Sequence, residues 1–228
     1  GRAMAEQQPL TREQIAAVIA RYLEPGWMVN LGVGMPMMVS NFVFPEQDIM
    51  FSSENGLIGY SGAAPEGEED WDTVNAGGRP MTIVPGATAV HHADSFAMIR
   101  RGLIDVTVLG AYEVALDGSF ANWKTNNDEF SNLGGIGGAM DLAACAQQVW
   151  VTMDHTTRDG QPRLLEHCQL PVTAPSGATL VVTDRAVVAV RDGRFELLEH
   201  APGFSVEEIQ AATGAPLAIS PDLHQIAV

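Results

Sequence analysis

The sequence has few cysteines and few basic residues, and each scarcity excludes a class of protein. Its two cysteines, Cys145 and Cys168, lie far apart among apolar neighbours. This placement is typical of reduced, buried thiols and not of a disulfide framework. The 12 lysines and arginines stand against 28 aspartates and glutamates, which gives a formal net charge of −16. A chain this acidic repels nucleic acid and anionic lipid, so we expect no nucleic-acid partner.

Long hydrophobic runs are also missing. No stretch approaches the roughly 20 continuous apolar residues that span a bilayer, and the N-terminus lacks the charged-then-apolar order of a secretory signal. We therefore expect no membrane partner and a cytoplasmic location. Gly1-Arg2-Ala3 precede Met4, so residues 1–10 are expected to be an expression-vector remnant and an N-terminal tail.

What the sequence does have is the composition of a globular protein. Its 228 residues are 46% hydrophobic and 18% charged, with 23 glycines and 13 prolines. That length is ample for a sizeable core, and the composition is far from the bias that marks disorder. We find no repeat or linker that would divide the chain, so residues 11–228 are predicted to form a single domain.

Short apolar runs alternate with helical patterns along the first two thirds of the chain. Thr11 and Gln14 form a capping box for an opening helix that ends at Pro25-Gly26. A strand at residues 27–31 then runs into glycines, after which residues 37–44 are predicted to form a helix begun by a proline. Further strands are expected at 49–52, 81–84, 106–109 and 149–153, and further helices at 95–101 and 139–146.

The last quarter of the sequence has a different pattern of apolar and turn residues. Short β-type runs are followed by a helix whose capping box is Ser205 and Glu208, with Gly214 expected as its C-terminal cap. The dipeptide Asp192-Gly193 between two of those runs is a hairpin turn signal. The predicted fold class is therefore α/β: an open, mostly parallel sheet covered by helices, with a C-terminal part that contains a β-hairpin. The expected strands here are residues 179–183, 186–190 and 195–198.

Several common catalytic patterns are missing. Gly32-Val33-Gly34 lacks the third glycine of a dinucleotide fingerprint, because Met37 stands there, and there is no phosphate-binding Gly-Lys-Ser/Thr loop. His91 and His92 are adjacent, so on a strand they would point to opposite faces, and no further ligand cluster has metal spacing. No Gly-x-Ser-x-Gly elbow occurs. We expect neither a metal nor a bound cofactor.

Ser52-Ser53-Glu54-Asn55-Gly56 is the first segment that can carry chemistry. If residues 49–52 are a parallel strand, Glu54 follows its carboxyl end, where open α/β sheets bind their ligands. Asn55-Gly56 supplies a tight turn that would present the carboxylate. Glu54 is then a candidate nucleophile, and the alternative is an exposed glutamate beside a turn.

The second such segment is a run of glycines ahead of a predicted helix, residues 134–138. Glycines allow close backbone approach, and their N–H groups can stabilise an oxyanion. This loop would suit a carboxylate that attacks an acyl group. The alternative is a plain glycine hinge.

With the rest of the chain, these segments resemble the B (beta) subunits of the family I CoA-transferases. This is the 3-oxoacid CoA-transferase group, which includes the succinyl-CoA:acetoacetate and 3-oxoadipate enzymes. The resemblance covers nearly the whole chain, from about Thr11 to about Ile219. It is carried by seven ordered motifs: Asn30-Leu31-Gly32-Val33-Gly34-Met35-Pro36, Ser53-Glu54-Asn55-Gly56-Leu57, Val74-Asn75-Ala76-Gly77, Pro85-Gly86-Ala87, Asp94-Ser95-Phe96-Ala97-Met98-Ile99-Arg100, Ala121-Asn122-Trp123 and Gly137-Gly138-Ala139-Met140-Asp141-Leu142.

The resemblance implies a function and a partner. Glu54 would be the covalent nucleophile and Gly138 would donate a backbone amide to the oxyanion hole, while the second oxyanion donor comes from a separate chain, the alpha subunit. We expect a heterotetramer of two alpha and two beta chains that acts on an acyl-CoA and a small carboxylic acid. CoA is here a substrate and not a cofactor. The residues expected to shape the substrate pocket are Gly32, Gly34, Asn55, Gly56 and Gly137.

The sequence departs from the family pattern at three places. Ser52 stands where an acidic residue is usual, Gly78 where a lysine is usual, and residues 124–133 replace a lysine-containing segment. The altered loop at 125–133 therefore motivates a second hypothesis, an acyl-CoA hydrolase or ring-opening enzyme on the same scaffold. A third is a non-catalytic, partner-binding subunit.

Overall fold

The computed structural model describes residues 5–52, 57–74, 80–89, 97, 101–122, 139–174 and 177–228. The chain divides into two compact units, which are described separately. The first comprises residues 1–15, 111–137 and 150–228, and the second comprises residues 16–110 and 138–149. The single-domain interpretation of residues 11–228 stays a prediction.

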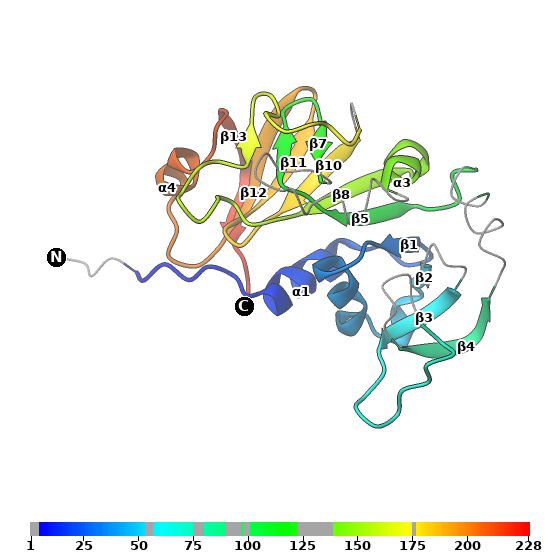
Figure 1. Ribbon diagram of the computed structural model, residues 1–228. Coiled ribbons are helices and arrows are strands. Elements are labelled where there is room, and N and C mark those ends of the chain that lie inside the picture. Colours follow the sequence, from blue (N-terminus) through cyan, green and yellow to red (C-terminus); the bar gives the residue numbers. More distant parts are fainter. Residues whose placement is uncertain are drawn as a thin grey trace. The chain divides into compact units, whose positions relative to one another are not determined.

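The second unit is built on a sheet with a parallel core. β1 pairs in parallel with both β2 and β5, and β3 and β4 extend the sheet in antiparallel fashion beyond β2. Val29, Val106 and Val108 are fully buried, as expected for parallel strands that are covered on both faces. The strands, in spatial order, are β5 (Val106–Gly110), β1 (Met28–Leu31), β2 (Met50–Ser52), β3 (Leu57–Ala63) and β4 (Met81–Ala89) (Figure 1).

The opening helix is confirmed, and the predicted second helix is wrong in type. In α1 (Arg12–Tyr22), the Thr11 backbone N–H donates to Gln14 Oε1 at 2.9 Å, and the Gln14 N–H donates to Thr11 Oγ1 at 3.2 Å. The segment predicted as a helix over 37–44 is instead the 3₁₀ helix η1 (Met35–Phe42). The sequence does not favour its continuation as an α-helix, because Phe44 precedes Pro45 and a residue before proline avoids the α region.

The other helices within the described residues are short. η2 (Pro45–Gln47) follows η1, α3 (Ala139–Cys145) lies within the predicted 139–146 helix, and α4 (Val206–Ala211) lies near the C-terminus. The 95–101 helix was predicted in a segment that lies almost wholly outside the described residues. Among the helices of the described ranges, none is long and apolar enough to cross a membrane.

The first unit contains the predicted C-terminal hairpin. β10, β11 and β12 are antiparallel neighbours, and β13 pairs with β12 in parallel. Asp192 and Gly193 connect β11 to β12 with φ values of 53° and 69°, as a two-residue turn of this kind requires. The bounds are β10 (Ala178–Val182), β11 (Ala186–Arg191), β12 (Arg194–His200) and β13 (Leu217–Gln225) (Figure 1).

Several strands complete the structure. The α/β fold class is confirmed, with parallel strands at its core and a C-terminal hairpin.

β8 (Gln148–Thr152), which was predicted at 149–153, spans the boundary of the two units. The small strands β6 and β7 are antiparallel, and β6 and β9 are parallel. Their bounds are β6 (Glu113–Ala115), β7 (Phe120–Ala121) and β9 (Leu164–Leu165).

The C-terminal helix confirms one predicted cap and corrects the other. Ser205 and Glu208 form the reciprocal capping box of α4. Gly214, predicted as the C-terminal cap, is not in that position, because the cap is Ala212. Gly214 instead donates its N–H to Leu164 O at 2.7 Å, and a Cβ at Gly214 would lie 2.8 Å from Leu165 Cδ2. A glycine stands there because two backbone segments approach closely.

Residues 5–10, which were expected to be a tail, make ordered contacts within the first unit. The Gln8 N–H donates to Pro202 O at 2.9 Å and the Leu10 N–H donates to Asp184 O at 2.7 Å. Leu10 is buried. This segment therefore adds both hydrogen bonds and apolar burial to the unit.

Candidate active site

The carboxyl ends of three parallel strands lie at one edge of the second unit's sheet. β5, β1 and β2 are neighbours, and Asn30 on the central strand is in register with both Thr107 and Ser52. Ser52 is the last residue of β2. Glu54 follows it by two residues in the sequence. Ligands of open α/β sheets bind outside the carboxyl ends of such strands, so this edge is the candidate active site (Figure 1).

Two of the predicted site residues lie within the described residues, and the others lie outside them. Gly32 and Gly34 directly follow β1 and are described. The roles assigned to all of these residues stay predictions. The ones outside the described residues are Glu54, Asn55, Gly56, Gly137 and Gly138.

Gly32 and Gly34 are each required by the local backbone. The Gly32 N–H donates to Val108 O at 2.8 Å, and a Cβ at Gly32 would lie only 3.0 Å from that same oxygen. Gly34 has φ of 90° and ψ of −133°, a conformation that residues with a Cβ rarely adopt. It directly precedes η1, which has a proline in its first turn. The two glycines thus let the chain leave β1 close to β5 and turn sharply.

A row of buried polar side chains crosses the parallel strands at this edge. Asn30, Ser52 and Thr107 are 2%, 6% and 0% exposed. Asn30 Nδ2 donates to the carbonyl oxygen of Ser52 at 3.3 Å, and Thr107 Oγ1 donates to Asn30 Oδ1 at 3.2 Å. Sequence reasoning missed the structural role of Asn30 and Thr107. The available signal was an asparagine inside the apolar run Met28–Leu31.

The other side of β2 is irregular at the same level. The β2–β3 pairing shifts register between Phe51 and Ser52, which face Tyr60 and Ile58. The extra residue is Gly59 on β3, with φ of 82°, so β3 bulges at a glycine. Such bulges are common beside active sites, where they end regular pairing.

An aromatic pair supports β2 just before this bulge. The rings of Phe51 and Tyr60 stack with centroids 5.8 Å apart and an interplanar angle of 28°. Both side chains are 2% exposed, and burial raises the pKa of the Tyr60 hydroxyl far above its usual value. Tyr60 is therefore neutral at every physiological pH, and it serves here as packing.

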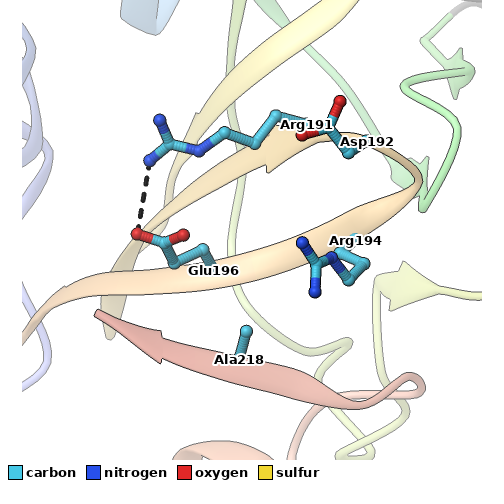
Figure 2. Close-up of a pocket in the computed structure, with 5 residues that line it drawn as sticks. All are labelled: Arg191, Asp192, Arg194, Glu196 and Ala218. Atoms are coloured by element: carbon cyan, nitrogen blue, oxygen red, sulfur yellow. Dashed lines mark hydrogen bonds and ion pairs between the residues drawn. The ribbon is translucent and has the colours of Figure 1, made fainter. Parts of the chain in front are cut away.

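A cavity of about 300 Å³ lies in the first unit, beside the hairpin. Figure 2 shows that the Arg191 side chain on β11 points toward Glu196 on β12, with Arg191 Nη2 and Glu196 Oε1 3.3 Å apart. Asp192, Arg194 and Ala218 complete its lining. None of the residues that line this cavity belongs to the seven motifs of the CoA-transferase resemblance. The ion pair between Arg191 and Glu196 is partly exposed and adds little to folding stability.

Metal-binding geometry is absent from the part of the chain that the structure describes. No group of three or more His, Cys, Asp or Glu side chains there could hold a metal ion. His91, His92 and Asp94 lie outside the described residues. The expectation of no metal and no cofactor stays a prediction.

Comparison with known proteins identifies the family. The sequence model of the family described as Coenzyme A transferase matches residues 12–212. The beta subunit of a probable coenzyme A transferase of Bacillus subtilis (strain 168) is 42% identical over 208 residues, which are 91% of this chain and 94% of that protein. The B subunit of the 3-oxoadipate CoA-transferase of Acinetobacter baylyi is 38% identical over 208 residues, covering 91% and 95%.

The fold agrees with the family match. The crystal structure of the acyl-CoA transferase YdiF from Escherichia coli O157:H7 aligns with a TM-score of 0.73 at 19% identity, covering all of this chain and 45% of that one. The sheet and its motif-bearing edge are thus those of a CoA-transferase fold. The chain belongs to the coenzyme A transferase family, and the predicted resemblance to its beta subunits is confirmed.

Proposed function

We propose that this chain is the catalytic beta subunit of a CoA-transferase and that Glu54 is its covalent nucleophile. The observation that carries the proposal is the end of β2 at Ser52, on the carboxyl edge of β5, β1 and β2. The chain continues directly into Ser53-Glu54-Asn55-Gly56. β2 is buried at Phe51 and Ser52 and pairs in parallel with β1. Open α/β sheets bind their ligands just beyond such strand ends, where a carboxylate can act as a nucleophile.

The reaction follows from the chemistry of a carboxylate and a thioester. An oxygen of Glu54 attacks the acyl-CoA carbonyl, the carbon–sulfur bond breaks, and an acyl-glutamyl anhydride and CoA thiolate result. The thiolate then attacks the glutamyl carbonyl and expels the acyl group as a carboxylate. The enzyme now carries CoA as a thioester on Glu54. A second acid runs the two steps in reverse, so the thioester is conserved without ATP.

Each tetrahedral intermediate carries a negative oxygen that must be stabilised. Gly138, directly before α3, would supply one backbone N–H, and an amide costs no side-chain desolvation at that place. The second donor would come from the alpha chain, so this chain would be an incomplete enzyme alone. The relatives are named as beta or B subunits, which implies a two-subunit enzyme. We propose a complex of two alpha and two beta chains, located in the cytoplasm.

The substrates are proposed from the relatives' names and from chemistry. The Acinetobacter baylyi relative is part of a 3-oxoadipate CoA-transferase. A 3-oxoacid is therefore the proposed acceptor and succinyl-CoA the proposed donor. Residues 124–133 depart from the family pattern, so they are the place where the choice of acid would differ.

The test is acid-dependent CoA transfer by the assembled alpha–beta complex. With succinyl-CoA and a panel of acids that includes acetoacetate and 3-oxoadipate, we expect new CoA esters and the parallel double-reciprocal lines of ping-pong kinetics. Glu54→Gln should lower the rate by roughly 10³-fold or more, since it removes the nucleophile. Glu66→Gln is the matched control, because the same change in an exposed loop should leave the rate unchanged.

An acyl-CoA hydrolase is the second candidate, favoured by the altered loop at 125–133. Transfer requires that water be kept from the glutamyl thioester, and a changed loop could admit it. The ratio of ester formed to thioester lost separates the two. Thioester loss that is equally fast with and without acid, in every acid tried, would reject transfer and favour hydrolysis.

A further inference from the structure

The polar row at the edge of the sheet is unusual in its setting. Strands buried on both faces are normally continuous runs of Val, Ile and Leu, and Val29, Val106 and Val108 follow that rule here. Asn30 and Thr107 lie among them, on the central strand and on its neighbour, and are equally buried. An amide and a hydroxyl in that interior are tolerated only when they are hydrogen-bonded.

The hydrogen bonds run in one direction across the sheet. The Ser52 carbonyl can only accept, so the side-chain amide of Asn30 must turn its NH₂ group toward β2. Its Oδ1 then faces β5, where the Thr107 hydroxyl donates to it. Thr107 therefore fixes the orientation of the Asn30 amide, and Asn30 holds the last carbonyl of β2. We call this chain of contacts the Thr107–Asn30 relay.

The relay acts where the ladder on the other side of β2 becomes irregular. The register shift opposite Gly59 falls between Phe51 and Ser52, so the β2–β3 ladder is interrupted just before Ser52, which pairs with Ile58 beyond the shift. The side-chain bond from Asn30 thus restrains the carboxyl end of β2 from the β1 side. The peptide that begins at this carbonyl leads into Ser53 and Glu54.

We propose that Asn30 and Thr107 are positioning residues for the nucleophile, acting through the Ser52 carbonyl. This rests on the proposed function of Glu54. A displacement of about 1 Å at a reacting group can cost about 100-fold in rate, so a restraint two residues away has catalytic value even where it adds no stability. The expected signature is a loss of kcat without a matching loss of substrate affinity, which the conservative hydroxyl variant restores.

Thr107→Val is the primary test, because it keeps the shape and removes only the hydroxyl. In the alpha–beta complex we expect kcat for CoA transfer to fall about 3- to 10-fold, the value of one lost hydrogen bond, with KM for the acyl-CoA within about twofold. The thermal midpoint should fall, because the buried Asn30 Oδ1 loses its hydrogen-bond donor. Thr107→Ser, which restores the hydroxyl, should recover kcat to within about twofold.

Thr152→Val is the matched control. Thr152 lies on β8, is 3% exposed, and its hydroxyl has no hydrogen-bond partner among the described residues. The same substitution there should leave kcat unchanged. An unchanged kcat in Thr107→Val, or an equal fall in both variants, would overturn the relay.

The proposed function is tested separately in the same experiment. Wild-type complex that forms no covalent CoA adduct on Glu54 would reject the proposed function itself. Wild-type complex that forms the adduct, with Thr107→Val forming it at the same rate, would reject only the relay. A slower rate in Thr107→Val, restored by Thr107→Ser, would support it.

Discussion

His155 Nε2 lies 2.9 Å from Thr213 Oγ1, and this contact fixes the protonation state of the imidazole. The Thr213 hydroxyl donates its hydrogen to Ile209 O at 2.7 Å, so it can only accept from the ring. Nε2 therefore carries a hydrogen. The ring joins the loop after β8 to the end of α4 within the first unit.

The opposite ring nitrogen is an acceptor. His155 Nδ1 lies 2.9 Å from Thr183 Oγ1, which already accepts from the backbone N–H groups of Arg185 and Ala186 at 3.1 Å. The Thr183 hydroxyl lies nearer to Nδ1, at 2.9 Å, than to its other acceptor, Ala186 O, at 3.4 Å. Donation to Nδ1 lets the neutral imidazole satisfy both threonines. Burial first, and the Arg185 charge second, lower the pKa of His155 to about 4. Asp184 accepts from the His155 backbone N–H, so its carboxylate is engaged there.

Acid should destabilise the protein through this histidine. The unfolded chain takes up the proton near pH 6.5 and the folded chain only near pH 4, so the contribution of His155 is fully present above pH 6.5 and is lost as the pH falls toward 4. The loss should reach about 3 kcal/mol of unfolding free energy. Urea titrations between pH 7.5 and 4.5 measure it.

His155→Gln should flatten this dependence, because the glutamine does not titrate. His167→Gln is the control, since it makes the same change at an exposed histidine of the same unit. An unchanged slope in His155→Gln would show that other groups carry the acid sensitivity.

The hairpin turn should depend on Gly193 through its backbone alone. Gly193 has φ of 69°, and a Cβ there would meet nothing within 4 Å. Gly193→Ala should therefore cost roughly 1–2 kcal/mol of unfolding free energy from backbone strain. Gly193→Asn should cost clearly less, because asparagine tolerates this conformation. Chemical denaturation measures both, and equal losses would contradict this explanation, because the left-handed backbone should cost alanine more than asparagine.

Cys168 should be a slow nucleophile. Burial first, and the negative charge of Glu113 second, raise the pKa of its thiol to about 11. Because the thiolate reacts, alkylation by iodoacetamide should keep rising about tenfold per pH unit from pH 7.5 to 10. Peptide mass mapping follows the rate at this position, with urea-unfolded protein as control. A rate that levels off below pH 9 in the folded protein would contradict the raised pKa.

Sequence patterns predicted most of the sheet, because apolar runs bounded by turns record burial directly. The strands at β1, β2 and β5 and the hairpin at Asp192-Gly193 are where their residues indicated. Cys145 and Cys168, expected to be buried, are free thiols that are half-buried. Their apolar sequence neighbours alone could not set their exposure, which depends on distant segments.

Other features depend on contacts that no local pattern contains. The relay needs Thr107 beside Asn30, residues 77 apart in the sequence. The true reason for Gly214 is the approach of Leu164 and Leu165, about 50 residues away in the sequence. β3, β6, β7, β9 and β13 were not predicted. β3 contains two glycines, β6, β7 and β9 are two or three residues long, and β13 contains a proline. Glu54 was recognised through its motif, and its chemistry still has to be measured.

Covalent trapping shows whether Glu54 is the nucleophile. The alpha–beta complex is incubated with succinyl-CoA, treated with borohydride and examined by intact-mass spectrometry and peptide mapping, beside Glu54→Ala. Borohydride reduces a glutamyl thioester to the alcohol, which lowers the mass by about 14 Da, because a thioester is far more electrophilic than a free carboxylate. We predict this loss in the peptide that contains Glu54 and its absence in Glu54→Ala. An unmodified Glu54 peptide with succinyl-CoA and with a panel of other acyl-CoA thioesters would show that Glu54 is not the nucleophile.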